Sequence, residues 1–302
     1  MSLPRPGLNP VFVREMRSRF RGARAFGALT VFLLIMTIAT AIAYYFTHLS
    51  YQYGYGWQNE SLGQSIFITV VLTEGILLGL TAPALTFGLL SSERDRGTWE
   101  LLLATPLSRW QIISGKVGAV LAYGLLMIAA VLPMLGITFV LGGVSPWSVL
   151  LSQLVILSSA ALLAAIGLAA SAVMSTTSRA AVTAYVAAAA VIVGPWLLLF
   201  LVEIGPIGSG DLVATLMQVS PLMLLIVGAG FSDMFGGGSD SLQWIGQQLL
   251  LQGILTGWLF LLAHSRVRRS ALGRGGPAVV GLLVFGMIMW LLWRLTVMVE
   301  PW

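Results

Sequence analysis

The stretch SIFITVVLTEGILLGLTAPALTFGLL, residues 65–90, contains a single charged side chain and leads directly into SSERDRGTWELLLATPLSRWQ, residues 91–111. A helix of about 20 apolar residues is long enough to cross the hydrocarbon core of a bilayer. The second stretch holds six charged side chains, which such a core does not accept. The pair therefore predicts a membrane span that ends in a polar loop, and the rest of the chain repeats this layout.

The composition agrees with a multi-span membrane protein. The chain has 302 residues, of which 58% are hydrophobic and 9% charged, and its mean hydropathy is +0.93. Soluble domains carry about 25% charged residues, so this chain has too few polar side chains to cover a core in water. It contains no cysteine, which excludes disulfides, cysteine-ligated metals and thiol nucleophiles.

Apolar runs of sufficient length predict an all-α polytopic protein with a single transmembrane domain over residues 1–302. The first six spans would form a core at 26–264, and the seventh would be an additional C-terminal span. We expect the spans at 26–47, 65–90, 112–141, 147–174, 181–202, 242–264 and 277–298.

Nearly all of the 16 Lys and Arg residues fall on one side of these spans, and the loops on the other side carry only acidic charges. Because cytoplasmic loops hold an excess of Lys and Arg, we expect a multi-pass protein of the plasma (inner) membrane with a cytoplasmic N-terminus. The same rule predicts an external re-entrant hairpin at 204–241. A full crossing there would move the basic segment 266–274 to the outside.

Residues 8–24 predict a helix that lies along the membrane surface. Apolar side chains recur on one side at four-residue spacing, and arginines lie on another side. Its apolar side would enter lipid and its arginines would approach anionic headgroups, although an ordinary basic flank of the first span is the alternative. The two sets are Phe12, Met16 and Phe20, and Arg14, Arg17 and Arg21.

The loop at 91–113 combines mixed charges with an apolar wedge. Ser92 with Asp95 and Ser108 with Gln111 match the capping pattern of helix starts. A short amphipathic helix of this kind suits docking into a groove of another protein, whereas a solvated turn with its Trp and Leu in the membrane interface is the alternative. The candidate partner-contacting residues are Glu93, Arg94, Asp95, Arg96, Gly97, Thr98, Trp99, Glu100, Leu101, Leu102, Pro106 and Arg109.

Glu74 is an acid well inside the second predicted span, so its side chain should face protein or water. It either lines a polar path or is a protonated acid that is hydrogen-bonded between helices. Gly75 and Gly79 follow as a GxxxG pattern, which allows close helix approach in a dimer seam but also arises by coincidence in a glycine-rich chain.

No catalytic constellation is present. The P-loop pattern GxxxxGK[ST] is absent, since Gly115–Lys116 is followed by Val and lacks the upstream Gly. The two histidines, His48 and His264, lie near span ends without companion metal ligands. We therefore expect no enzyme activity and no metal or cofactor bound by this chain, so any energy must come from a partner chain.

The run SSERDRGTWELLLATPLSRWQIISGK, residues 91–116, resembles the cytoplasmic loop of type-2 ABC exporter permeases. The matching positions are Glu93, Gly97–Thr98, Glu100–Leu101–Leu102, Pro106 and Gly115–Lys116. The segment NPVFVREMRSRFR is similar to that family's N-terminal interfacial helix, and the predicted hairpin with Ser220–Pro221 fits its external hairpin. The resemblance covers about residues 9–265, and the seventh span departs from the six that are common in the family.

The resemblance implies a coupling helix that contacts a separate ABC ATPase subunit, with ATP and Mg held by that subunit. It also implies a second permease protomer, in a homodimer or a heterodimer. The expected function is export of a substrate across the lipid bilayer, with no nucleic-acid partner. A non-transporting membrane scaffold that anchors a cytoplasmic complex through the same loop is the alternative.

Overall fold

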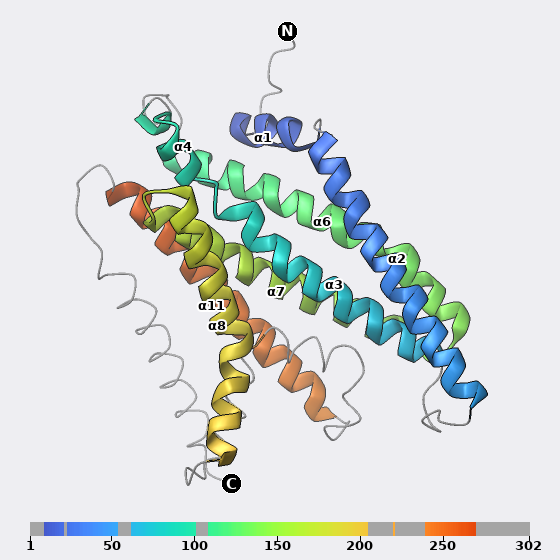
Figure 1. Ribbon diagram of the computed structural model, residues 1–302. Helices are drawn as coiled ribbons and strands as arrows, with labels where there is room; N and C mark the ends of the chain where they lie inside the picture. Colours follow the sequence, from blue (N-terminus) through green and yellow to red (C-terminus); the bar gives the residue numbers. More distant parts are fainter. Residues whose placement is uncertain are drawn as a thin grey trace.

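Six long helices form the body of the part of the chain that the structure describes. The computed structural model describes residues 9–20, 23–53, 62–100, 108–204, 220 and 239–269. Within these ranges, six helices are long and apolar enough to cross a membrane, judged by length and composition. They are α2 (Ala23–Gln52), α3 (Leu62–Thr86), α6 (Arg109–Leu141), α7 (Pro146–Val173), α8 (Thr177–Ile204) and α11 (Ser239–Arg269). The short helices α1 (Pro10–Phe20) and α4 (Ser91–Asp95) lie at one end (Figure 1).

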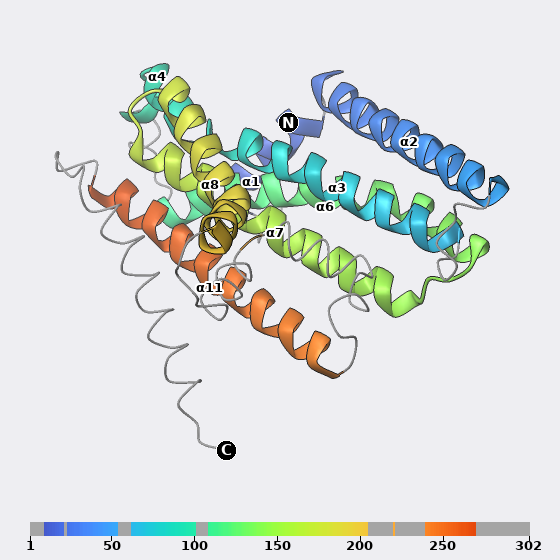
Figure 2. The ribbon, with the colours of Figure 1, turned by 60° about the horizontal axis from the view of Figure 1, so that its bottom comes forward.

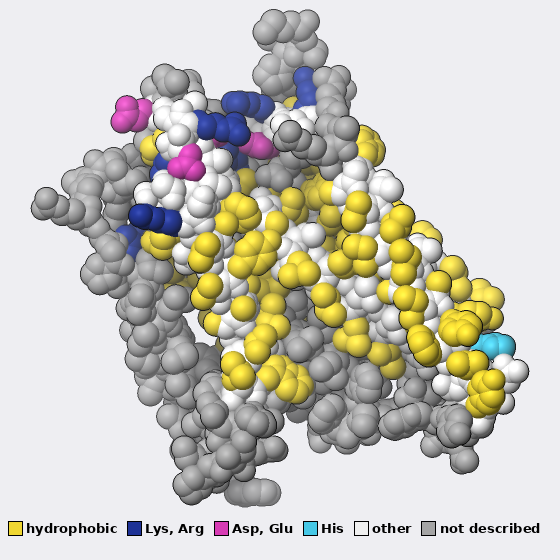
Figure 3. Space-filling view, in the orientation of Figure 1, with side chains coloured by type: hydrophobic (Ala, Val, Ile, Leu, Met, Phe, Trp, Pro, Cys, Tyr) yellow, Lys and Arg dark blue, Asp and Glu magenta, His cyan; other side chains and the backbone are white. Residues whose placement is uncertain are grey.

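Helix α7 lies at the centre of the bundle, where it contacts α3, α6, α8 and α11. Helix α2 packs on α3 at one edge, and α11 lies at the opposite edge (Figure 2). The main core contains buried side chains such as Phe67, Met127 and Ile156, from α3, α6 and α7. The outward faces carry many exposed apolar side chains (Figure 3), as expected of helices surrounded by lipid.

The six spans predicted between residues 26 and 264 are confirmed by these six helices, and no strand occurs among the described residues. The seventh predicted span at 277–298 lies outside the described residues, as does the hairpin at 204–241 apart from its ends and Ser220. Four candidate site residues also lie outside them, namely Arg21, Leu101, Leu102 and Pro106.

One of the two predicted helix starts in the 91–113 loop is confirmed. The Ser108 hydroxyl accepts a hydrogen bond from the Gln111 amide at 3.2 Å, and the Gln111 side chain accepts one from the Ser108 amide at 2.9 Å. This reciprocal capping box satisfies two amides at the start of α6.

At the other predicted start a short helix does begin, α4 at Ser91, but the predicted cap of Ser92 with Asp95 is wrong. The Ser92 hydroxyl donates to the Gly88 carbonyl one turn earlier, and the Asp95 carboxylate accepts from another helix. The amides of Leu90 and Ser91 instead donate to the Ser171 hydroxyl, at 2.9 and 3.0 Å. A side chain 80 residues away therefore replaces the local cap, and no short-range pattern reveals that.

The short amphipathic helix expected in the loop at 91–113 is interrupted. Helix α4 ends at Asp95, the chain turns through Arg96 and Gly97, and helical backbone resumes at Trp99. Gly97 has a φ of 67°, in the left-handed region where a residue with a Cβ atom is strained. The glycine therefore allows the chain to change direction before Trp99.

Candidate functional site

The loop between α3 and α6 is fixed to the end of α7 by Arg94. Its guanidinium donates to the carbonyls of Ser171, Ala172 and Met174, at 3.4, 2.9 and 2.8 Å respectively. These carbonyls lie at the C-terminus of α7, where a helix leaves acceptors unsatisfied and carries a partial negative charge. Arg94 is thus a cap supplied by another segment of the chain.

Asp95 caps the N-terminus of the next helix, α8, as Arg94 caps the C-terminus of α7. Its carboxylate accepts a hydrogen bond of 2.7 Å from the amide of Thr177, the first residue of α8. A carboxylate is favourable at a helix N-terminus, where amides are unsatisfied and the partial charge is positive. The loop therefore binds both ends of the short turn that joins α7 to α8.

Lys116 connects the same loop to α1 and α6. Its ammonium lies 3.0 Å from a carboxylate oxygen of Glu93 and 3.3 Å from one of Glu15, on α1. Lys116 is only 5% exposed, so the two acids balance a charge that is largely removed from water. Glu93 also accepts a hydrogen bond from the Thr98 hydroxyl, which closes the loop on itself.

Trp99, which was predicted to contact a partner, also makes contacts within its own chain. Its ring lies 5.4 Å from the Arg94 guanidinium carbon, within cation–π range. It also packs against a buried cluster that includes Leu90, Ile113 and Leu168. The expected wedge toward a partner is therefore partly used inside the molecule, because the turn at Gly97 brings the indole back over the base of the loop.

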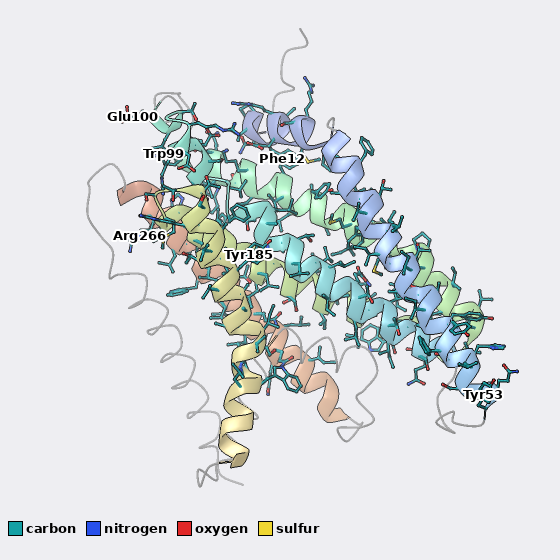
Figure 4. All side chains as sticks on the ribbon, viewed as in Figure 1. Phe12, Tyr53, Trp99, Glu100, Tyr185 and Arg266 are labelled. Carbon is teal, nitrogen blue, oxygen red and sulfur yellow. The ribbon has the colours of Figure 1, made fainter. Side chains whose placement is uncertain are left out.

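The tip of the loop is exposed. Among the candidate loop residues whose exposure the structure describes, Asp95, Arg96, Gly97 and Glu100 are exposed, while Glu93, Arg94, Thr98 and Trp99 are half-buried. Figure 4 shows Trp99 and Glu100 at the same end of the molecule as Phe12 and Arg266, with Tyr53 at the other end. Basic and acidic side chains gather at this end in Figure 3.

The predicted surface helix is seated on α6. Asn9 caps α1 by accepting from the Val11 amide at 3.0 Å, and its side-chain amide donates to the Gln111 carbonyl at 2.5 Å. A Cβ atom at Gly115 would lie 2.8 Å from the Val11 Cβ atom. The backbones of α1 and α6 therefore approach closely because residue 115 is glycine.

Two of the three apolar residues of α1 that we expected in lipid contact protein. The Phe12 ring lies over Gly118, where an added Cβ atom would be 3.1 Å from it, and the Phe20 ring meets Tyr123 edge-on at 5.9 Å. Gly118 on α6 leaves room for the Phe12 ring, which the spacing within α1 does not show. Arg14 and Arg17 are exposed and Met16 is half-buried.

Glu74 and Gly79 both face α7. Glu74 is fully buried and accepts a hydrogen bond of 3.0 Å from the Gln153 side chain. A Cβ atom at Gly79 would lie 3.6 Å from the Leu163 side chain. The GxxxG pattern thus places Gly79 in a contact within the chain, whereas Gly75 is half-exposed.

Several residues of this site escaped prediction. Ser171 acts through its hydroxyl and Thr177 through its backbone amide. Gln153 is the sole amide side chain of α7. A polar residue in an uncharged span is the signal that points to Gln153. For the other two, the sequence carries no comparable signal.

A bundle of six apolar helices, with a charged loop anchored at one end, defines a multi-pass membrane protein. The sequence matches the family described as "ABC-2 family transporter protein" over residues 10–225, which is most of the chain. The protein therefore belongs to the ABC-2 transporter family, as a membrane-spanning transport permease. A comparison with curated proteins finds no match.

Proposed function

We propose that a separate ATP-binding subunit drives this permease by docking on the exposed tip of the loop, at Arg96, Gly97 and Glu100. ABC-2 family membership supports an ATPase partner in general terms. The mixed charges at the tip favour a protein partner, because arginines alone would be enough to set the topology.

The observation that carries this proposal is the contrast between a fixed base and an exposed tip. Arg94 and Glu93 are half-buried and bind α7 and Lys116, and the exposed Asp95 binds α8, whereas Arg96 and Glu100 present exposed charges beyond these attachments. A segment that transmits movement needs firm attachments on one side and a free surface on the other. The loop has both.

The attachments also define what a push on the tip would move. The loop is bound to the turn between α7 and α8, and through Lys116 to α1 and α6. Movement of the tip would therefore reach at least four helices of the permease. ATP and Mg would bind in the ATPase, so this chain needs no nucleotide site of its own.

The loop end would lie in the cytoplasm, together with the N-terminus, in the plasma (inner) membrane. The Lys and Arg residues of α1, α6 and the loop lie at the same end, which agrees with the positive-inside rule. Two permeases, alike or different, would enclose the path of an exported substrate.

The test is co-purification of an ATP-binding chain with tagged permease from its native membrane. Photo-crosslinking with an azido-ATP would identify that chain by its label. Arg96→Glu combined with Glu100→Lys should remove the labelled chain and the ATP hydrolysis of the preparation. The matched control is Tyr53→Glu, which adds a charge at the exposed opposite end of the molecule (Figure 4).

The control variant should retain both the label and the hydrolysis. If the double variant is folded and still recovers the labelled chain in full, docking at the loop tip is wrong. If no nucleotide-labelled chain accompanies even the unchanged permease, the ATPase partnership itself is wrong.

A further inference from the structure

Only one of the two carboxylate oxygens of Glu74 has a hydrogen-bond partner. The Gln153 Nε2 atom donates to Glu74 Oε2 at 3.0 Å. The other oxygen of each side chain, Glu74 Oε1 and Gln153 Oε1, is buried and has no hydrogen-bond partner. Two acceptors of one pair are therefore left over, and a single proton would satisfy both.

The surroundings do not favour a charged carboxylate. Glu74 is the sole charged residue of α3, and α7 contains none. The Glu74 side chain is 0% exposed, and the described residues show no ion pair to it. An ionised acid in such a place is costly, whereas a protonated acid needs only one acceptor for its O–H group.

We propose that Glu74 is held as a neutral carboxylic acid that donates from Oε1 to Gln153 Oε1. The acid and the amide then form a reciprocal pair, in which each group donates once and accepts once. The Gln153 amide keeps one further N–H donor. Glu74 is thus a positioning residue that joins α3 to α7 as a neutral acid, and this role requires no negative charge.

A second polar contact reinforces this pair. Ser171, near the C-terminus of α7, accepts from the amides of Leu90 and Ser91 just beyond α3. Between these contacts α3 lies directly on α7, at Gly79 and again at Gly167. Helices α3 and α7 are therefore held together at several points along their shared face.

Infrared spectroscopy of the full-length protein in lipid nanodiscs tests the proton directly. The carbonyl band of a protonated carboxylic acid should be present at neutral pH and should disappear in Glu74→Gln. Glu93→Gln is the matched control, because Glu93 is paired with Lys116 and should contribute no such band. Absence of the band from the unchanged protein, or its survival in Glu74→Gln, overturns the proposal.

Stability gives a second and independent test. Glutamine has nearly the shape of a neutral glutamic acid and can donate to Gln153 Oε1, so Glu74→Gln should unfold at nearly the same temperature as the unchanged protein. Glu74→Leu leaves both polar groups of Gln153 without a partner and should unfold clearly earlier. If Glu74→Gln is destabilised as much as Glu74→Leu or fails to fold, the acid is needed as a carboxylate and the proposal is wrong.

Discussion

Arg94 and Asp95 are neighbours in the sequence and bind the two opposite ends of one turn, Arg94 the C-terminus of α7 and Asp95 the N-terminus of α8. Each charge has the sign that complements the helix end it meets. The pair therefore holds the turn at 174–176 and the loop at 91–98 together as one unit.

Removal of the Arg94 side chain should weaken this unit. Arg94→Ala leaves the carbonyls of Ala172 and Met174 without their donor, and we expect a loss of about 1–3 kcal/mol in the free energy of unfolding. Unfolding in SDS measures it. Arg94→Lys keeps the charge but not the fork of donors, so it should recover only part of the loss, and full recovery would show that charge alone matters.

Lys116 should be coupled to its two acids. Lys116→Met leaves Glu15 and Glu93 without a buried cation, and we expect a loss of about 3 kcal/mol in unfolding free energy. Glu93→Gln in the Lys116→Met background should cost less than Glu93→Gln in the unchanged protein. A double-mutant cycle measures this difference, and strict additivity would mean that the contact contributes nothing.

The seat of α1 should depend on the absence of a side chain at Gly115. Gly115→Ala places a Cβ atom 2.8 Å from Val11 Cβ and 2.9 Å from the Phe12 amide nitrogen, so α1 must shift. Limited trypsin digestion should then cut faster after the exposed residues Arg14 and Arg17. Gly124→Ala is the matched control on the same helix, because nothing lies within 4 Å of its added Cβ atom, and the digestion rate should not change.

The capping box of α6 should make a measurable contribution of its own. Ser108→Ala removes the acceptor for the Gln111 amide, and we expect a loss of about 1 kcal/mol in unfolding free energy. Ser108→Thr preserves the hydroxyl and should lose much less. Equal losses in the two variants would show that the hydroxyl does not act as a cap.

The sequence predicts the helices well because membrane insertion depends on local properties. A run such as 112–141 is apolar over more than 20 residues, and it forms α6 almost as expected. The capping box at Ser108 is equally local, since its two partners are three residues apart.

The site is less predictable because its contacts are distant in the sequence. Arg94 and Ser171 are 77 residues apart in the sequence, and Glu74 and Gln153 are 79 residues apart, yet each pair is hydrogen-bonded in the fold. The charges of 93–96 are predicted to serve a partner, and three of the four side chains also bind this chain, through Lys116 of α6, the end of α7 and the start of α8. These contacts depend on how the loop packs on distant helices, which the sequence does not show.

The seat of α1 on α6 has a consequence for biogenesis. Asn9 and Gln111 are 102 residues apart, and Asn9 leaves the ribosome first. Helix α1 is thus complete long before its binding surface at Gly115 and Gly118 has been synthesised. Helix α1 can therefore reach its final place only after the third of the described spans has been made, so closure of this end of the bundle must wait for α6.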